Sequence, residues 1–327
     1  MSVDIVQPSY MKSKFGLDIY YEHYPNEGKK TLILIHGLFS STFSYRKLIP
    51  LLKQDFNLIA IDLPPFGQSE KSNTFIYSYR NMAKIIIELA GYLQIQHAIL
   101  VGHSMGGQIA LYAASERPDL FEKAVLLCSS GYMNKSKKSL VYSTYIPYFY
   151  LYLKRKLFKQ GIMKNLTAVV HDHSIIDQEM VDGYLKPFSD DQIFRGIFRL
   201  IRHREGDLAS DVLKKMETPV LLIWGEEDRI VPIQIGERLH KDLPHSTFHA
   251  LKKPGTSSLR KIRSLCLIKL VISACLKTSR SYFLLWQKAD LRYAGSFPSE
   301  EADQMSGGKW LECLSRKITG LLRRIRH

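Results

Sequence analysis

The sequence predicts an α/β fold, in which a mostly parallel central sheet carries helices on both faces. Short continuous apolar runs, of the kind that form buried parallel strands, alternate with segments whose apolar residues recur at helical spacing. This alternation builds βαβ units, and such sheets bind ligands at the carboxyl ends of their strands. The expected strands are 11–15, 18–24, 31–37, 56–64, 97–104, 123–130, 219–225 and 246–251, with helices at 48–54, at 81–93 and from 105 to about 115.

The segment between residues 130 and 219 has no strand character and is far longer than an ordinary crossover connection. It combines helical apolar spacing (Ile193, Ile197, Ile201) with many aromatic residues, namely Tyr142, Tyr145, Tyr148, Phe149, Tyr150, Tyr152 and Phe158. We therefore expect a helical cap inserted into the core. The expected organisation is a first core part at 1–137, the cap at 138–211, a second core part at 212–253 and an atypical basic tail at 254–327.

The net charge of +15 is concentrated in that tail, where 14 Lys and Arg face 5 Asp and Glu. A basic tail can bind anions without being a nucleic-acid domain, and no recognition motif accompanies it, so no nucleic-acid partner is expected. The four cysteines show no CxxC spacing, the start lacks the apolar core of a signal peptide, and no apolar run reaches membrane-spanning length. We expect a cytoplasmic protein without a transmembrane segment, and neither metal nor cofactor is implied.

The strongest local signal is GHSMGG at 102–107, which joins an expected buried strand to an expected helix. In a G-x-S-x-G turn the serine occupies a strained, exposed position, and only glycines on either side leave room for it. Ser104 is therefore the expected nucleophile. The backbone N–H of Met105 begins the helix, where it can stabilise an oxyanion.

Three further loops follow strands in an order that, together with the serine turn, resembles the α/β-hydrolase superfamily, specifically its capped serine-hydrolase branch. These loops are HGLF at 36–39, DLPPFGQS at 62–69 and GEEDRIVP at 225–232. The resemblance covers roughly residues 12–253. A serine at position 104 excludes the haloalkane-dehalogenase and epoxide-hydrolase chemistries of that superfamily, which use aspartate there.

The resemblance implies a role for each loop. Leu38 would supply the second oxyanion N–H, with the His36 side chain supporting its loop. Asp62 and Ser69 would shape the second loop. Asp228 would be the triad acid, although Glu226 and Glu227 could also fill this role. Alternatively, all three residues form a solvated acidic turn without a catalytic role. The expected pocket-lining side chains are Phe39, Phe66 and, from the cap, Tyr145.

The general base of the triad is missing from its expected place. The superfamily usually puts Gly-His just after the final strand, but here STFHAL is followed by KKPGT, and no histidine comes after that strand until His327. Without a base, a serine hydroxyl is a poor nucleophile. The nearby His249 and His245, and the cap residues His173 and His203, are the substitutes considered, and each is more simply a structural or surface histidine.

A reading-frame change explains why the pattern decays at this point. Read one base earlier from Lys253, suitable synonymous codons for PGTSSLRKIRSLC become TGHLLLEENPELV, which supplies the missing Gly-His. We hypothesise that residues from about Pro254 onward are out of frame relative to an ancestral gene. The alternatives are an unusual tail that evolved in frame and, for LECLSRKITGLLRRIRH, an amphipathic helix on a membrane surface.

These observations predict a serine hydrolase of a small ester, thioester, lactone or activated carbonyl substrate. It would act through an acyl-enzyme and would be impaired in this chain by the loss of the histidine. One rival is a catalytically dead small-molecule binding protein that kept the pocket. A second rival is a protein whose basic tail binds a membrane surface or nucleic acid. Substrate identity and oligomeric state are left open.

Overall fold

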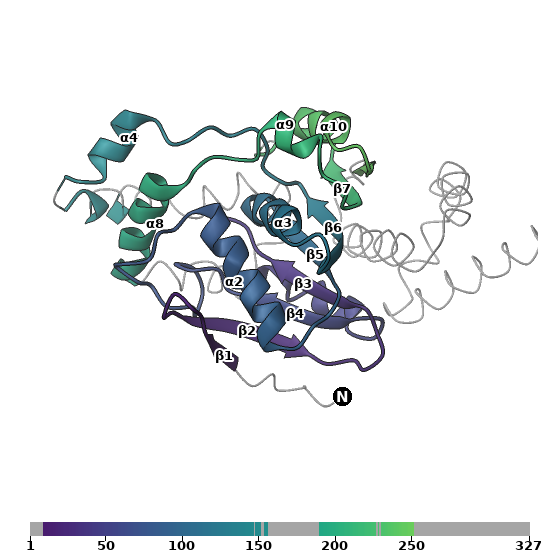
Figure 1. Cartoon of the computed structure of the whole chain (residues 1–327). Coiled ribbons are helices and arrows are strands. Elements are labelled where there is room, and N and C mark those ends of the chain that lie inside the picture. Colours follow the sequence, from purple (N-terminus) through teal and green to yellow (C-terminus); the bar gives the residue numbers. More distant parts are fainter. Residues whose placement is uncertain are drawn as a thin grey trace, which may run out of the picture. The chain divides into compact units, whose positions relative to one another are not determined.

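A computed structural model describes residues 9–146, 148–151, 154–155, 190–226, 228 and 230–251 (Figure 1). The expectations for His173 and for the tail at 254–327 lie outside the described residues, as does much of the expected cap. Among the described residues, no helix combines the length and apolar character that crossing a membrane would need.

The core is an eight-stranded sheet with the order β1-β2-β4-β3-β5-β6-β7-β8. β1 and β2 form an antiparallel hairpin, β2 is antiparallel to β4, and all other neighbours are parallel. The predicted mostly parallel sheet is confirmed. The strands are β1 Ser9–Lys12, β2 Asp18–Tyr24, β3 Thr31–Ile35, β4 Asn57–Ile61, β5 Ala98–His103, β6 Phe121–Leu127, β7 Val220–Gly225 and β8 Ser246–Leu251.

Both faces of the central strands are buried, which explains their continuous apolar sequences. In β3, Leu32 and Leu34 face one side while Ile33 and Ile35 face the other, and all four are inaccessible to solvent. A strand buried on both sides cannot show the polar alternation of a half-exposed strand. The expected strand ends are less exact than the strands themselves, because β1, β4 and β6 each end three residues before the predicted end and β1 and β6 each begin two residues earlier than predicted.

Helices α2 (Tyr79–Tyr92) and α3 (Met105–Glu116) pack side by side, with α3 lying against β5 and β6 (Figure 1). The remaining described helices of the core are η1 (Thr42–Tyr45), α1 (Ile49–Leu52) and α10 (Ile233–Asp242). η1 contacts β3 and β4, and α10 contacts β7 and β8. The helical spacing of the sequence thus locates the helices to within a few residues.

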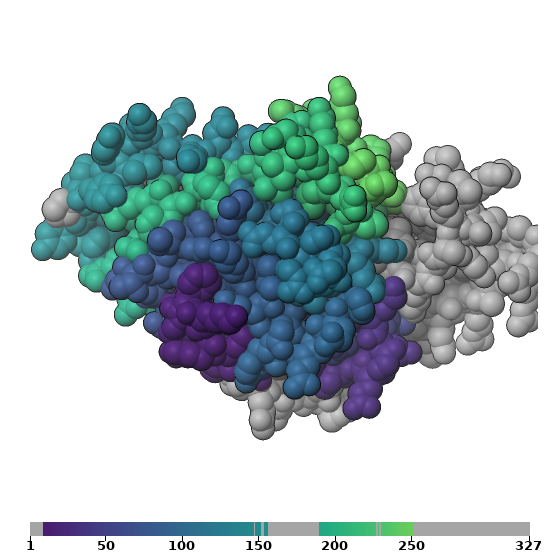
Figure 2. Space-filling model, in the orientation of Figure 1, coloured from purple at the N-terminus to yellow at the C-terminus, as the bar shows by residue number. Residues whose placement is uncertain are grey.

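The described part of the expected cap consists of α4 (Lys138–Ser143), α8 (Asp191–His203) and α9 (Ser210–Leu213). Figure 2 shows the surfaces of α8 and α2 adjoining each other. The connection after α8 binds α2 directly, because the Glu205 carboxylate accepts hydrogen bonds from the N–H groups of Tyr79 and Arg80, both at 2.8 Å. A carboxylate at the start of a helix also interacts favourably with the helix dipole. The connection after α8 is therefore fixed to α2.

Two glycines, both in helices, should respond oppositely to replacement by alanine. A methyl group on Gly106 of α3 would lie 2.3 Å from the carbonyl oxygen of Ile35, whereas Gly91 of α2 has nothing within 4 Å of that position. We expect Gly106→Ala to lower the free energy of unfolding by about 1–3 kcal/mol or more through overpacking. Gly91→Ala should raise it by about 0.5–1 kcal/mol through helix propensity. Urea denaturation of both variants checks this, and equal effects would contradict the close approach of α3 to β3.

Candidate active site

Ser104 lies between the last residue of β5 and the first residue of α3, with φ 52° and ψ −120°. This left-handed φ is costly for a residue with a side chain, so the surroundings must impose it. The Ser104 N–H donates to the Leu127 carbonyl at 3.1 Å, and its own carbonyl accepts from the Ser130 N–H at 3.1 Å. Both bonds come from β6 and the loop that follows it, and they hold the turn in place.

The flanking glycines allow the helix to approach the strand ends. A methyl group on Gly102 would lie 2.5 Å from the Gly106 carbonyl oxygen, and one on Gly107 would lie 2.3 Å from the Ser129 hydroxyl oxygen. Neither backbone position has room for a side chain. The G-x-S-x-G spacing thus has the physical cause that the sequence indicated, a sharp turn between strand and helix.

Two backbone N–H groups are available beside Ser104. Leu38 follows Gly37, and a methyl group on Gly37 would lie only 3.2 Å from the Ser104 Cβ. Met105 is the first residue of α3, so its N–H has no partner within the helix. Within the described part of the chain, no hydrogen bond engages the N–H of Leu38 or of Met105. Free donors near a nucleophile are what an oxyanion hole requires.

His36 supports the loop that carries Leu38, as the sequence indicated. Its ring is fully buried, its Nδ1 contacts the Gly37 carbonyl oxygen at 2.7 Å, and its Nε2 accepts from the Leu63 N–H at 2.9 Å. The second bond requires a lone pair on Nε2, so the proton sits on Nδ1 and the ring is neutral. Burial lowers the pKa of His36 to about 4, in keeping with this form.

Asp62 and Ser69 shape the neighbouring loop. The Asp62 carboxylate accepts from the N–H groups of Thr42 and Gln68, both at 2.7 Å, and the Ser69 hydroxyl donates to the Asp62 carbonyl at 2.5 Å. Burial raises the pKa of Asp62 to about 7. These bonds join η1 to the loop after β4 and leave the carboxylate no role at Ser104.

Asp228 lies at the same edge of the sheet as Ser104, because it follows β7 as Ser104 follows β5 and these strands are parallel. Its Oδ1 accepts from the N–H groups of Ile230 and Val231 at 2.8 and 2.9 Å. The Cys128 thiol, at the end of β6, also hydrogen-bonds to it, and burial together with this carboxylate raises the pKa of Cys128 to about 12. The carboxylate is therefore held in place beside Cys128, the residue that follows β6.

The described histidines considered as substitute bases, namely His249, His245 and His203, have other positions or partners in the fold. His249 lies inside β8 in register with Ile223, Leu127 and His103 on the neighbouring strands. Three strand spacings of about 4.8 Å therefore separate it from β5, roughly 14 Å. His245 precedes β8 at the opposite end of the sheet. His203 accepts a hydrogen bond from the Tyr77 N–H at 3.1 Å, which is a structural role.

His103, the residue before Ser104, was not among the residues predicted from the sequence. Its side chain is exposed at the site, and a methyl group on Gly37 would lie 3.1 Å from its Nδ1. Its position inside the serine turn could have identified it, since a neighbour of the nucleophile must lie at the strand ends too. In the described part of the chain the Ser104 hydroxyl makes no hydrogen bond, to His103 or to any other group.

The three expected pocket residues occupy different environments. Phe39 is partly exposed beside Leu38 and meets Phe66 edge-on, with ring centroids 6.2 Å apart. Phe66 is completely buried beneath it. Tyr145 is 63% exposed, and the Arg202 guanidinium lies 3.9 Å above its ring. The structure thus brings Phe39 and Phe66 together at the site loops, while Tyr145 belongs to the packing between α4 and α8.

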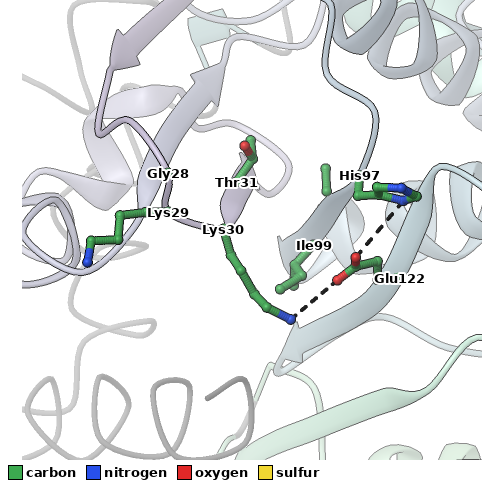
Figure 3. A pocket seen from close by; sticks show the side chains of 8 residues that line it. Gly28, Lys29, Lys30, Thr31, His97, Ile99 and Glu122 are labelled. Carbon is green, nitrogen blue, oxygen red and sulfur yellow. Dashed lines mark hydrogen bonds and ion pairs between the residues drawn. The ribbon is translucent and has the colours of Figure 1, made fainter. Parts of the chain in front are cut away.

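A separate pocket of about 300 Å³ lies at the other end of the sheet (Figure 3). Thr31 and Ala98, which begin β3 and β5, form part of its wall. Glu122 pairs there with Lys30 at 3.5 Å and with His97 at 4.0 Å. Because Ser104 follows the carboxyl end of β5, this pocket cannot deliver a ligand to it.

Comparison with known proteins agrees with this architecture. A model of the family described as alpha/beta hydrolase fold matches residues 30–258. The chain belongs to this family. It is 58% identical over 253 residues to the uncharacterized hydrolase YugF of Bacillus subtilis, an alignment that spans 77% of this chain and 93% of that protein.

More distant relatives have named activities. A 2-hydroxy-6-oxononadienedioate/2-hydroxy-6-oxononatrienedioate hydrolase of Paraburkholderia phymatum is 26% identical over 235 residues, which is 70% of this chain and 81% of that protein. Among solved structures, the meta-cleavage product hydrolase CumD of Pseudomonas fluorescens matches with a TM-score of 0.64 at 21% identity, over 81% of this chain and 96% of that chain. That likeness shows a shared fold.

The buried neutral His36 makes stability depend on pH. Its pKa is about 4 in the folded chain against an ordinary 6.5, so the unfolded chain binds more protons between these values. The stability that the neutral ring contributes is therefore lost as the pH falls from 6.5 to 4, by up to about 3 kcal/mol. We expect the difference in unfolding free energy between the wild type and His36→Asn to shrink over that window.

Urea denaturation at a series of pH values measures this difference. The exposed His245 provides the control, because His245→Gln should keep a constant difference from the wild type. A constant difference for His36→Asn as well would show that the ring is not held neutral by burial.

Proposed function

We propose that the chain is a serine hydrolase of a small ester, thioester, lactone or activated carbonyl substrate, acting through an acyl-enzyme and impaired by the loss of its triad histidine. The observation that carries this proposal is the strained Ser104, with φ 52°, beside the free N–H groups of Leu38 and Met105. Backbone strain of this kind is concentrated at active sites. The named hydrolase activities of the relatives support the reaction class.

In the proposed reaction, the Ser104 oxygen bonds to the substrate carbonyl carbon while its proton passes to a base. The negative charge on the carbonyl oxygen is stabilised by the N–H groups of Leu38 and Met105. Collapse of this intermediate expels the leaving group, which takes up the proton and leaves an acyl group on Ser104. Water then attacks the acyl carbon by the same route and releases the acid. Asp228 would orient a histidine and stabilise its cation.

The lost histidine follows from the proposed change of reading frame near Lys253. The family match ends at residue 258, and the alignment with the Bacillus subtilis relative leaves only 7% of that protein but 23% of this chain unmatched. The described residues up to Leu251 keep the family architecture to the end of β8.

A second candidate is a binding protein that retained the pocket without catalysis. The observation that favours it is the Ser104 hydroxyl, which has no base hydrogen-bonded to it among the described residues. Saturable binding of a small carbonyl compound without turnover would distinguish this candidate from the hydrolase.

Ser104 should be the residue that forms a covalent bond with an activated fluorophosphonate probe. Among the described serines, it alone combines a strand-to-helix turn with two neighbouring free N–H donors, so peptide mapping should find the label on it. Ser104→Ala should abolish labelling, whereas Ser115→Ala, at an exposed serine of the same helix, should leave it unchanged. Labelling of another serine, with Ser104 untouched in folded protein, would refute the assignment.

Turnover of a short p-nitrophenyl ester should be at least about a thousandfold slower with this chain than with a frame-restored version, because triad members act as a unit. The frame-restored protein should carry Gly-His after Lys253 and lose activity on Asp228→Asn. A robust rate with the present chain that depends on Ser104 would contradict the impairment. Sequencing the gene tests its cause, since DNA without a histidine codon in the earlier frame would exclude the frameshift.

A further inference from the structure

His103 shares the space next to the nucleophile. One methyl group placed on Gly37 would lie 3.1 Å from the His103 Nδ1 and 3.2 Å from the Ser104 Cβ. The His103 Nδ1 and the Ser104 Cβ can therefore be no farther apart than the sum of these two distances. His103 is an exposed residue. Small side-chain rotations at an exposed position occur on the nanosecond timescale, so the ring can approach the Ser104 hydroxyl.

The charged and titratable groups around His103 come from three neighbouring strand ends. Asp228, after β7, is close enough for its carboxylate to raise the pKa of His103. The protein atoms around the ring have the larger effect, because they disfavour the charged form, and the net result is a pKa below its ordinary value. His36, after β3, is buried and neutral. Cys128, after β6, keeps its thiol proton. The result is a neutral imidazole near neutral pH with a carboxylate nearby to stabilise its cation.

No other described histidine meets these conditions. His249 is three strands away from β5, and His245 lies at the other end of the sheet. His36 is committed to two hydrogen bonds inside the loop. His103 is thus the described histidine whose ring both reaches the serine turn and lies in the field of Asp228.

We propose that His103 acts as a surrogate general base for Ser104 in this chain, with Asp228 as its electrostatic partner. The inference rests on the proposed function and adds a catalytic residue to it. As the Ser104 oxygen bonds to an electrophilic carbon or phosphorus, its proton passes to an imidazole nitrogen, and the imidazolium then returns the proton to the leaving group. A base outside the usual triad position gives slow reaction, so only strongly activated electrophiles react measurably.

The rate at which a fluorophosphonate labels Ser104 tests this inference in the full chain. His103→Gln should lower the rate at least about tenfold, a modest part of what general bases contribute. His249→Gln is the matched control and should leave the rate unchanged. Free imidazole should restore labelling of His103→Ala, which a purely structural role would not permit. The wild-type rate should rise with pH through one deprotonation below pH 6.5, the ordinary pKa of histidine, and His103→Gln should remove that rise.

The outcomes separate the inference from the proposed function. Equal rates for the wild type and His103→Gln, with Ser104 still labelled, overturn the role of His103 and leave Ser104 as the nucleophile. A loss confined to His249→Gln assigns the role to that residue instead. Failure of the probe to label Ser104 in any variant overturns both proposals. If His103→Gln does not fold, the labelling rate of His103→Asn and the pH dependence of the wild-type rate test the role of His103 in its place.

Discussion

The close approach of α3 to the ends of β3 and β5 is the constraint on which the site depends. Gly102 and Gly106 allow this approach, because a methyl group at either position would overlap backbone atoms of the facing segment. The chain can then turn only through a left-handed residue, Ser104, whose carbonyl and N–H are held by the loop after β6. The same geometry places the first N–H of α3 beside the serine. The strain at Ser104 and the position of the Met105 N–H, the features from which its role as nucleophile is proposed, thus have one cause.

The two loops beside this turn are rigid for electrostatic reasons. His36 and Asp62 are buried polar groups, and each is satisfied by backbone partners, which makes them structural supports. Asp228 has partners of the same kind, but it also lies within the field of an exposed imidazole, His103. The buried ionisable groups, His36 and Asp62, thus shape the loops, whereas the exposed His103 is accessible to a ligand.

Much of this architecture could be predicted from the sequence. Continuous apolar runs indicate strands that are buried on both faces of the sheet, and the glycine spacing indicates a close contact between the backbones of a strand and a helix. The strands after residue 30 and the turn at Ser104 follow from such local signals. The sequence could not show that Phe66 is buried or that Tyr145 stacks with Arg202, since these depend on packing between distant segments. His103 could have been identified from its position next to Ser104 in the sequence, but its proximity to Asp228 depends on the tertiary structure.

A crystal structure of the protein after reaction with a fluorophosphonate tests the central claim most directly, namely that the turn at Ser104 is already built for acyl transfer. The account predicts a covalent bond from phosphorus to the Ser104 oxygen, with a phosphoryl oxygen within hydrogen-bond distance of the N–H groups of Leu38 and Met105 and little backbone movement. A phosphoryl oxygen that faces away from both N–H groups, or a turn that must rearrange to react, would contradict it.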